Sequence, residues 1–199
     1  MKRLFIISSI LALILVLVFF LIPNSQELLS FSGTKFLAGE VYRLITFSFV
    51  HVNLSHLIEN LVALALVSFL GFEFGLRGKE FITYFLAISL VIALGDAFLF
   101  PLLVIAGASL GIYGILGALA IKGSNFIPKK VLIPVFIVSI FYKVILNIFT
   151  SQPITNIEQT LFHLSGFLTG IVFIIIPRFK KKKYILSNRK WIKKEWKQE

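Results

Sequence analysis

The sequence contains no cysteine, and charged residues are scarce in it. Without cysteine the chain has no disulfide bonds, no thiol catalysis and no zinc site built on thiolates. Charged residues make up 15% of the chain and apolar residues 58%, whereas an average soluble domain is roughly 25% charged and about 45–50% apolar. This composition does not fit an ordinary soluble domain, and a content of 22 phenylalanines excludes a disordered chain.

Acidic residues are the scarcer of the two charge types, with 9 against 20 basic residues and a net charge of +11. Ten of the basic residues lie within residues 178–199, directly after an apolar run. Such a segment is typical of the cytoplasmic flank of a membrane span, so we expect no nucleic-acid partner. Trp191 and Trp196 stand among these lysines, which predicts an amphipathic tail that binds the anionic lipids of the cytoplasmic leaflet.

Long apolar runs dominate the rest of the chain, each close to the ~20 residues that cross a bilayer core. The expected spans are residues 4–22, 55–74, 81–99, 103–121, 131–149 and 157–177. The first run is too long for a signal peptide and is not followed by a small-residue cleavage site, so we expect a retained helix. The pattern predicts an all-α, polytopic bundle of six helices over residues 1–177, followed by a basic tail over 178–199.

Basic residues between the spans predict the orientation in the membrane. With six spans, four basic clusters fall on one side of the membrane: Lys2 and Arg3, Arg77 and Lys79, Lys122 with Lys129 and Lys130, and the tail. The positive-inside rule then places both termini in the cytoplasm. The abundance of Phe, Ile and Lys is typical of AT-rich prokaryotic genomes, so we expect a multi-pass protein of a prokaryotic plasma membrane.

Several polar residues interrupt the spans at helical spacing. His56 and Asn60 are four residues apart, as are Ser109 and Tyr113, so each pair shares one helix face. Counted from the nearest cytoplasmic basic residue, Asn60, Ser109 and His163 stand roughly 20 to 25 Å above the cytoplasmic edge. At one level in the outer half of the membrane, these side chains offer a nucleophile, a base and an oxyanion donor.

Glycines form matching stripes on the fourth and sixth spans. The stripes comprise Gly107, Gly111, Gly114 and Gly117 on the fourth span, and Gly166 and Gly170 after His163 on the sixth. Small residues let two helices approach closely. We expect these spans to pack glycine to glycine, which would bring Ser109 and His163 together. Taken by itself, the stripe on the fourth span is better explained by simple packing than by a function.

In order, spacing and sidedness, these residues resemble the rhomboid intramembrane serine proteases over about residues 36–175. The matching positions are Arg43 after Tyr42, His51 with His56 and Asn60, Glu73, Gly107-Ala108-Ser109 with Tyr113 and Gly117, and His163 with Gly166 and Gly170. The family usually has glycine directly after the serine, where this chain has Leu110. The resemblance implies an endopeptidase that cuts single-span membrane proteins near their outer edge, after a small residue.

The expected chemistry uses a two-residue dyad, with no cofactor and no metal. Ser109 is the candidate nucleophile, and His163 is the base that takes its proton and later donates it to the leaving amine. We find no carboxylate on the sixth span to orient His163, and we expect Tyr113 to stack against its ring instead. His56, Asn60 and the backbone N–H of Ser109 are the candidate oxyanion donors.

Other features have expected roles around this site. Arg43 is expected to fix the loop between the first two spans, and His51 to join that loop to the rim of the site. The apolar segment 96–106 is expected to dip into the membrane, and the polar segment 150–157 to act as a flexible cap. For Lys143, inside the fifth span, snorkelling, an interior pairing and a substrate contact all remain open.

Three other functions compete with the protease. A non-catalytic rhomboid-like binding protein or chaperone is favoured by Leu110, although both dyad residues are present. A small transporter or channel is disfavoured because the chain shows no internal symmetry. A metal site built from the three histidines is disfavoured because no acidic partner stands at ligand spacing.

Overall fold

The computed structural model describes residues 2–150 and 157–195. Its long helices are α1 (Lys2–Leu21), α5 (Leu54–Glu73), α6 (Gly78–Leu99), α7 (Ser109–Lys122), α8 (Lys129–Phe149) and α9 (Ile157–Glu195). The shorter elements are α2 (Ser25–Leu29), β1 (Phe31–Ser32), α3 (Gly33–Leu37), α4 (Arg43–Thr46), η1 (Phe47–Phe49), β2 (Val104–Ile105) and η2 (Gly123–Asn125).

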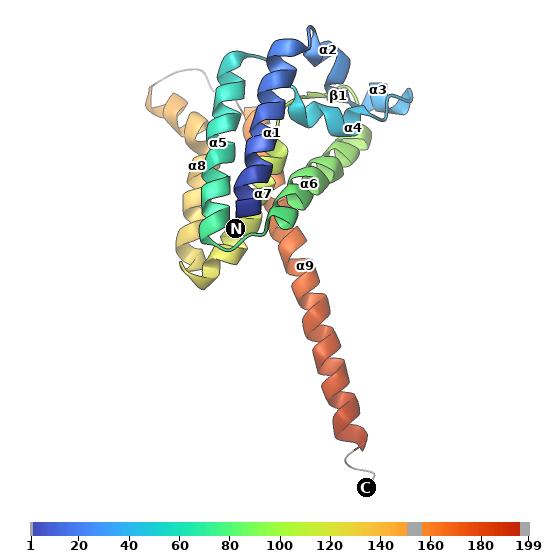
Figure 1. Ribbon diagram of the computed structural model, residues 1–199, viewed down its shortest axis with the longest axis vertical. Helices are drawn as coiled ribbons and strands as arrows, with labels where there is room; N and C mark the ends of the chain where they lie inside the picture. Colours follow the sequence, from blue (N-terminus) through green and yellow to red (C-terminus); the bar gives the residue numbers. More distant parts are fainter. Residues whose placement is uncertain (1, 151–156, 196–199) are drawn as a thin grey trace.

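A bundle of long helices surrounds α7 (Figure 1), which packs against α5, α6, α8 and α9. Every residue of α7 from Leu110 to Ile121 is buried except Tyr113, which is half-buried. The glycines and alanines of α7 allow this, because small residues let neighbouring helices approach its backbone. The surrounding helices expose large apolar side chains on their outward faces, including Leu13, Val62 and Val135, which suits contact with lipid.

Among the described residues, five helical segments are long and apolar enough to cross a membrane, namely α1, α5, α6, α8 and the part of α9 over Ile157–Ile176. Their bounds closely follow five of the predicted spans. With 14 residues, α7 extends ~21 Å, less than a core of about 30 Å. The count of six spans and the cytoplasmic termini stay predictions. The N-terminus and the outgoing part of α9 lie at the same end of the bundle (Figure 1).

The fourth predicted span begins later than the sequence indicated, at Ser109 instead of residue 103. The residues before α7 are extended, because β2 pairs antiparallel with β1 through Phe31↔Ile105 and Ser32↔Val104. The apolar residues of β2 therefore form their backbone hydrogen bonds with β1, about 70 residues earlier in the chain. Apolar composition alone cannot reveal such a pairing. This two-stranded ladder is the only departure from an all-α fold in the described part of the chain.

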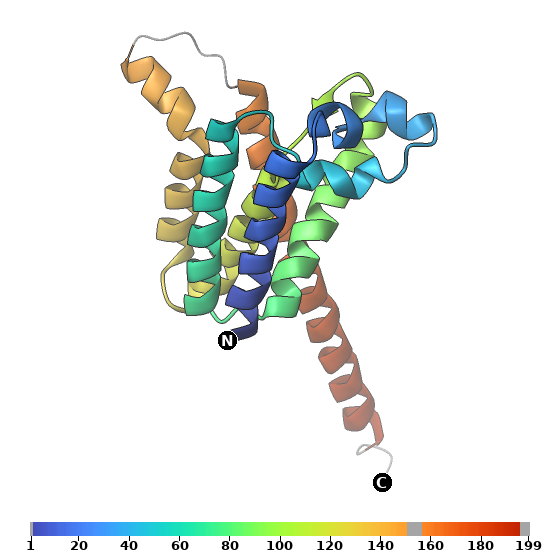
Figure 2. The ribbon, with the colours of Figure 1, turned by 45° about the horizontal axis from the view of Figure 1, so that its top comes forward.

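Residues 22–53 form a lobe beside the bundle, which we call the loop-one lobe (Figure 2). The lobe packs tightly against the C-terminal end of α6. A Cβ atom at Gly33 would lie 2.6 Å from the Ala97 carbonyl oxygen and 2.7 Å from the Pro101 Cα. This close approach positions β1 to pair with β2, only a few residues before Ser109.

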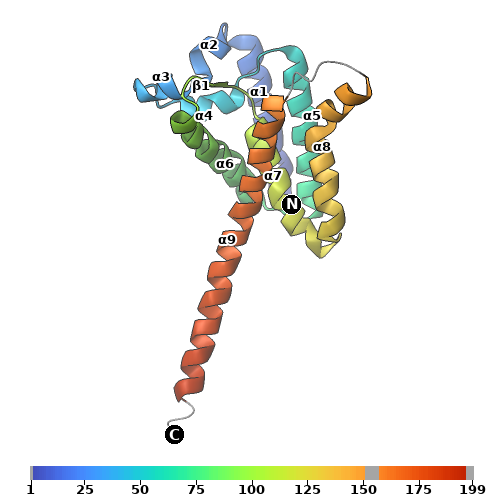
Figure 3. The same ribbon diagram turned by 180° about the vertical axis from the view of Figure 1, so that it is seen from behind.

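The last helix does not end with the sixth predicted span. We expected the span to stop at residue 177, but α9 continues without a break to Glu195 and extends straight away from the bundle (Figure 3). The amphipathic tail that we expected along the lipid surface is thus a continuation of the span in this structure. Its binding to anionic lipid stays a prediction.

Candidate active site

Ser109 is the first residue of α7 and lies half-buried at the wall of a cavity of about 410 Å³. The turn before it depends on Gly107, whose φ of 121° is left-handed and is readily adopted by glycine. The Gly107 N–H donates to the Phe47 carbonyl oxygen at 2.9 Å. A glycine turn that is tied to the loop-one lobe thus sets the position of Ser109.

The His163 ring is buried and stacks on Tyr113, with ring centroids 4.1 Å apart and an interplanar angle of 19°. Tyr113 stands one turn after Ser109 on α7. The predicted stacking is therefore present, and it links the orientation of His163 to the helix that begins at Ser109.

The predicted glycine packing between the fourth and sixth spans is confirmed for α7 and α9. A Cβ atom at Gly170 would overlap the carbonyl oxygen of Gly114, and one at Gly117 would overlap that of Phe167. At Gly166 a Cβ atom would lie 2.7 Å from the Leu110 carbonyl oxygen. These contacts bring His163 onto the first turns of α7.

His56 stands in the first turn of α5, where the Asn53 side chain caps the helix by accepting from the His56 N–H at 2.8 Å. Its ring covers the glycine turn, because a Cβ atom at Gly107 would lie 2.8 Å from the His56 Cε1. His56 also lines the cavity with Ser109. Two of the predicted site residues, from helices far apart in the sequence, thus meet at this cavity.

Asn60 is buried, but it is not among the residues that line the cavity. Its Nδ2 donates to the His56 carbonyl oxygen at 2.8 Å, within its own helix. In this structure the amide braces the backbone under His56. Its predicted role as an oxyanion donor stays a prediction.

His51 is buried beside the site, and its ring lies edge-on to that of His56, with centroids 5.2 Å apart. Burial, with a smaller contribution from the neighbouring His56, lowers the pKa of His51 to about 4. His51 therefore stays neutral near pH 7. This contact fits the predicted position at the rim.

In the described part of the chain, Nε2 of His163 is buried without a hydrogen-bond partner, and the same holds for Nε2 of His56. Ser109 Oγ and His163 are therefore not hydrogen-bonded in this structure. Each of these two ring nitrogens keeps its capacity to accept or donate a proton. Among the described residues, no group of three or more acidic or histidine side chains is arranged to hold a metal ion.

An ion pair that the sequence did not reveal lies on the cavity wall. Lys143 Nζ of α8 is 2.7 Å from Glu59 Oε2 of α5, and both side chains line the cavity with Ser109. Of the three readings left open for Lys143, the interior pairing is confirmed. Glu59 follows His56 by one helical turn; its signal in the sequence was a carboxylate inside an otherwise apolar helix.

Leu110 is the position at which the chain departs from the family pattern. Its side chain is 1% exposed and packs with Phe31, Phe47 and Ile105 of the loop-one lobe and β2. Its carbonyl oxygen, and not its side chain, is the atom close to Gly166. The leucine therefore leaves the close contact between α7 and α9 intact.

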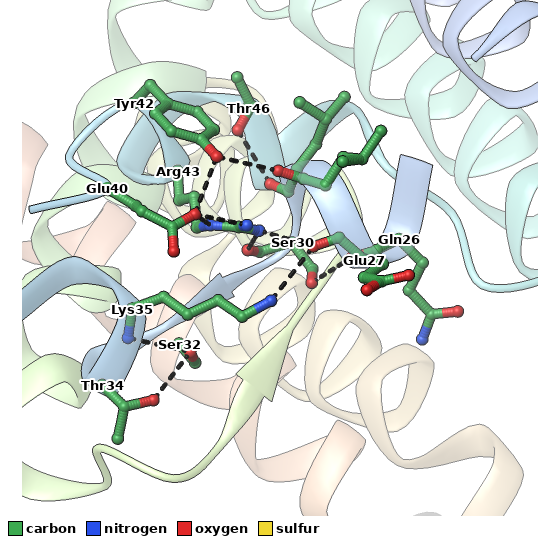
Figure 4. Close-up of polar contacts among 12 residues, drawn as sticks. Gln26, Glu27, Ser30, Ser32, Thr34, Lys35, Glu40, Tyr42, Arg43 and Thr46 are labelled. Carbon is green, nitrogen blue, oxygen red and sulfur yellow. Dashed lines mark hydrogen bonds and ion pairs between the residues drawn. The ribbon is translucent and has the colours of Figure 1, made fainter. Parts of the chain in front are cut away.

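Arg43 lies outside the cavity and is buried in the loop-one lobe (Figure 4). Its guanidinium pairs with Glu40 at 2.6 Å and donates to the carbonyl oxygens of Glu27 and Ser30 at 3.0 and 2.8 Å. The paired guanidinium and the Tyr42 hydroxyl lower the pKa of Glu40. These contacts fit the expectation that Arg43 fixes this loop.

Three predictions remain, for Glu73 and for the segments 96–106 and 150–157. Glu73 is exposed at the last residue of α5, ~26 Å along the helix from His56. Phe98 and Leu99, at the C-terminal end of α6, and Leu102 just after it are exposed, and their predicted dip into the membrane stays a prediction. The predicted cap at 150–157 falls on residues 151–156, which lie outside the described residues.

Comparison with known families gives one further finding. Residues 38–178 match the family model described as Rhomboid domain. The match covers more than half of the chain and includes the site residues from Arg43 to Gly170. The comparison with curated proteins found no match.

Proposed function

Because the chain belongs to the rhomboid family, we propose that it is an intramembrane serine endopeptidase that hydrolyses a peptide bond in or near the transmembrane segment of membrane proteins. With its apolar helices, the chain is an integral, multi-pass membrane protein. The observation that carries the proposal is the His163 ring stacked on Tyr113, one turn after a serine at a cavity wall. That arrangement pairs a nucleophile with a base.

Catalysis begins with Ser109 Oγ attacking the scissile carbonyl while Nε2 of His163 takes its proton. His163 then donates this proton to the leaving amine, and water hydrolyses the acyl-enzyme in a second round of the same chemistry. The unpartnered Nε2 of His163 supports this role. Stacking on Tyr113 replaces the carboxylate that orients the base in a triad.

The tetrahedral intermediate carries a negative charge that needs hydrogen-bond donors. The Ser109 N–H lies at the first turn of α7, where the helix dipole favours negative charge. His56 lines the same cavity, and its buried Nε2 has no hydrogen-bond partner among the described residues. Asn60 contributes by holding the backbone of His56 or, after a rotamer change, by donating directly.

Water and substrate reach Ser109 through the cavity of about 410 Å³, whose wall carries Asn53, Ser55 and Gln159 besides the ion pair. We propose that a single-span substrate enters laterally beside α8. Its helix must unwind near the cut, because helical hydrogen bonds otherwise hide the scissile carbonyl. The glycines at 107, 166 and 170 support the site by positioning its helices.

Leu110 is the observation that favours a second candidate, a non-catalytic rhomboid-like protein that binds membrane proteins. Its side chain is packed into the loop-one lobe, while its neighbour Ser109 remains at the cavity. We therefore propose that Leu110 changes how the substrate fits the site and how fast it is cleaved, and not whether the dyad is present. Direct measurement of cleavage distinguishes the two functions.

The experiment compares purified wild type, Ser109→Ala and His163→Ala in lipid vesicles with a single-span substrate and a chelator present. We expect cleavage by wild type and a loss of several orders of magnitude in both variants. Ser9→Ala, at an exposed serine on α1, is the matched control and retains full activity. Cleavage that survives Ser109→Ala would contradict the mechanism, and folded wild type that cleaves none of several substrates would favour the non-catalytic function.

A further inference from the structure

A second cavity, of about 390 Å³, lies in the loop-one lobe and is not used by the proposed protease chemistry. Its lining is polar apart from one valine: Asn24, Gln26, Glu27, Ser30, Ser32, Lys35 and Val104. The lining thus carries one cation, Lys35, and one carboxylate, Glu27. Val104 also lines the cavity at Ser109, so the two cavities meet at β2.

Lys35 and Glu27 form no ion pair within the described part of the lobe, and the ammonium of Lys35 acts on Glu40 only at longer range, where it helps to lower the pKa of that carboxyl. Lys35 Nζ donates to the backbone carbonyl oxygen of Glu27 at 3.2 Å (Figure 4). In the residues that the structure describes, neither side chain takes part in an ion pair. The nearby Arg43, by contrast, is already committed to Glu40 and to two carbonyl oxygens. The cavity therefore offers an ammonium and a carboxylate to a ligand.

The position of this cavity along the membrane normal matches lipid headgroups. With 20 residues, α1 spans ~30 Å, the thickness of the hydrocarbon core. Asn24 and Glu27 follow the end of α1 directly, at the level where headgroups begin. The lobe around the cavity exposes apolar side chains, with Leu28 at 51%, Leu37 at 61% and Ile45 at 57%. A polar cavity beside exposed apolar side chains suits an amphiphile.

We propose that this cavity binds the headgroup of a phospholipid that carries a phosphate and a primary ammonium, as in phosphatidylethanolamine. Lys35 donates to the phosphate, the Glu27 carboxylate accepts from the ammonium, and the acyl chains lie along the exposed apolar side chains of the lobe. A choline headgroup has no N–H to donate to Glu27. A glycerol headgroup brings no cation to Glu27, so the pair of side chains selects for ethanolamine.

Lipid binding by the full-length protein in mild detergent tests this proposal without reference to protease activity. Native mass spectrometry measures lipid retention after addition of palmitoyl-oleoyl phosphatidylethanolamine, phosphatidylcholine or phosphatidylglycerol at equal concentration. We expect the wild type to retain the ethanolamine lipid about fivefold more strongly than either of the others, equivalent to ~1 kcal/mol. Equal retention of the three lipids would overturn the proposal.

Two variants separate the contacts. Glu27→Gln should remove the preference for ethanolamine over choline, because it removes the carboxylate that the ammonium needs. Lys35→Gln should weaken retention of all three lipids, because it removes the phosphate contact. The matched controls are Glu73→Gln at the last residue of α5 and Lys79→Gln in the first turn of α6, both exposed, which should retain the wild-type preference. The turn between α5 and α6 lies at the end of the bundle away from α2 and α3 (Figure 1). A wild-type preference in Glu27→Gln, or wild-type retention of the three lipids in Lys35→Gln, would also overturn the proposal.

Discussion

The orientation of His163, the proposed base, depends most on the stacking of its ring on Tyr113. Stacked aromatic rings contribute about 0.5–1.5 kcal/mol beyond the apolar area that they bury. In Tyr113→Ala the His163 ring would lose this support and sample other rotamers. We expect the cleavage rate in lipid vesicles to fall about two- to tenfold. Tyr113→Phe keeps the ring and should stay near wild type; an equal loss in both variants would show that the hydroxyl, and not the stacking, matters.

The buried His51 makes the fold sensitive to mild acid. Its pKa is about 4 in the folded chain and about 6.5 when unfolded. Between these values the unfolded chain binds a proton that the folded chain refuses, so stability is lost as the pH falls from 6.5 towards 4. We expect the thermal unfolding midpoint in mild detergent to fall less over this range in His51→Gln than in wild type. Parallel pH profiles of the two proteins would contradict this account.

The spacing of polar residues predicted much of the site at the level of single side chains. Tyr113, which shares a helix face with Ser109, stacks on His163 as expected, and the pairing of Ser109 with His163 stays a prediction. The hydrogen bond from Asn60 to the carbonyl oxygen of His56, one turn earlier on its own helix, was not predicted, and the role of Asn60 as an oxyanion donor stays a prediction. The partner of Lys143 was not predictable, because Glu59 comes from another helix and only the folded bundle brings the two together.

Between elements, the tightest contact is the one between α7 and α9, where glycine leaves no room for a side chain. A Cβ atom at Gly170 would overlap the Gly114 carbonyl oxygen, so Gly170→Ala must force the two helices apart. We expect a loss of about 1–3 kcal/mol in the free energy of unfolding and slower cleavage, because His163 moves away from Ser109. The measurements are unfolding in detergent and activity in vesicles.

Gly95→Ala on α6 is the matched control for this substitution. A Cβ atom there has no neighbour within 4 Å. The alanine should therefore leave activity unchanged and stabilise the helix by up to about 1 kcal/mol. If Gly170→Ala proved as harmless as Gly95→Ala, the close packing of α7 on α9 would not position the dyad.

A single ion pair links α5 to α8 at the cavity, where the two helices otherwise approach each other little. Both side chains are partly exposed, so solvent screens the pair and we expect a coupling free energy of only about 0.2–1 kcal/mol. A double-mutant cycle with Glu59→Gln, Lys143→Gln and the double variant measures it by unfolding in detergent. Strictly additive effects would show that the two charges do not interact.

The sequence predicted which segments become helices better than where those helices begin and end. Apolar composition identifies a span, but it does not distinguish a helix from the extended strand β2, which is just as apolar. The start of α7 is set by Gly107 and by the pairing of Val104 with Ser32, and both partners lie outside the helix. Likewise the end of a span is not the end of a helix, because lysines continue α9 readily.

At the scale of the whole molecule, α7 is the short member of the bundle and the one that the others enclose. Its 14 residues extend ~21 Å, so Ser109 stands below the outer ends of the longer helices around it. The extended residues before α7 pair their backbone with β1, as non-helical backbone near a membrane requires, while the side chains of Leu102 and Val104 are exposed. A serine recessed in this way is reached from a cavity and not from the bulk solvent.

If α7, together with the extended segment that precedes it, crosses the membrane, then the chain has six crossings. An even number of crossings places both termini on one side, and the basic residues between the helices make that side the cytoplasm. The sequence has no cysteine, so single cysteines introduced into it can be labelled without background. We expect Gln26→Cys, in the loop-one lobe, to react with a membrane-impermeant maleimide in intact cells.

Ser124→Cys and Gln198→Cys should react only after the membrane is opened. Labelling of Gln198→Cys but not Ser124→Cys in intact cells would mean an odd number of crossings after residue 124, and α7 would then no longer share its cytoplasmic end with the tail.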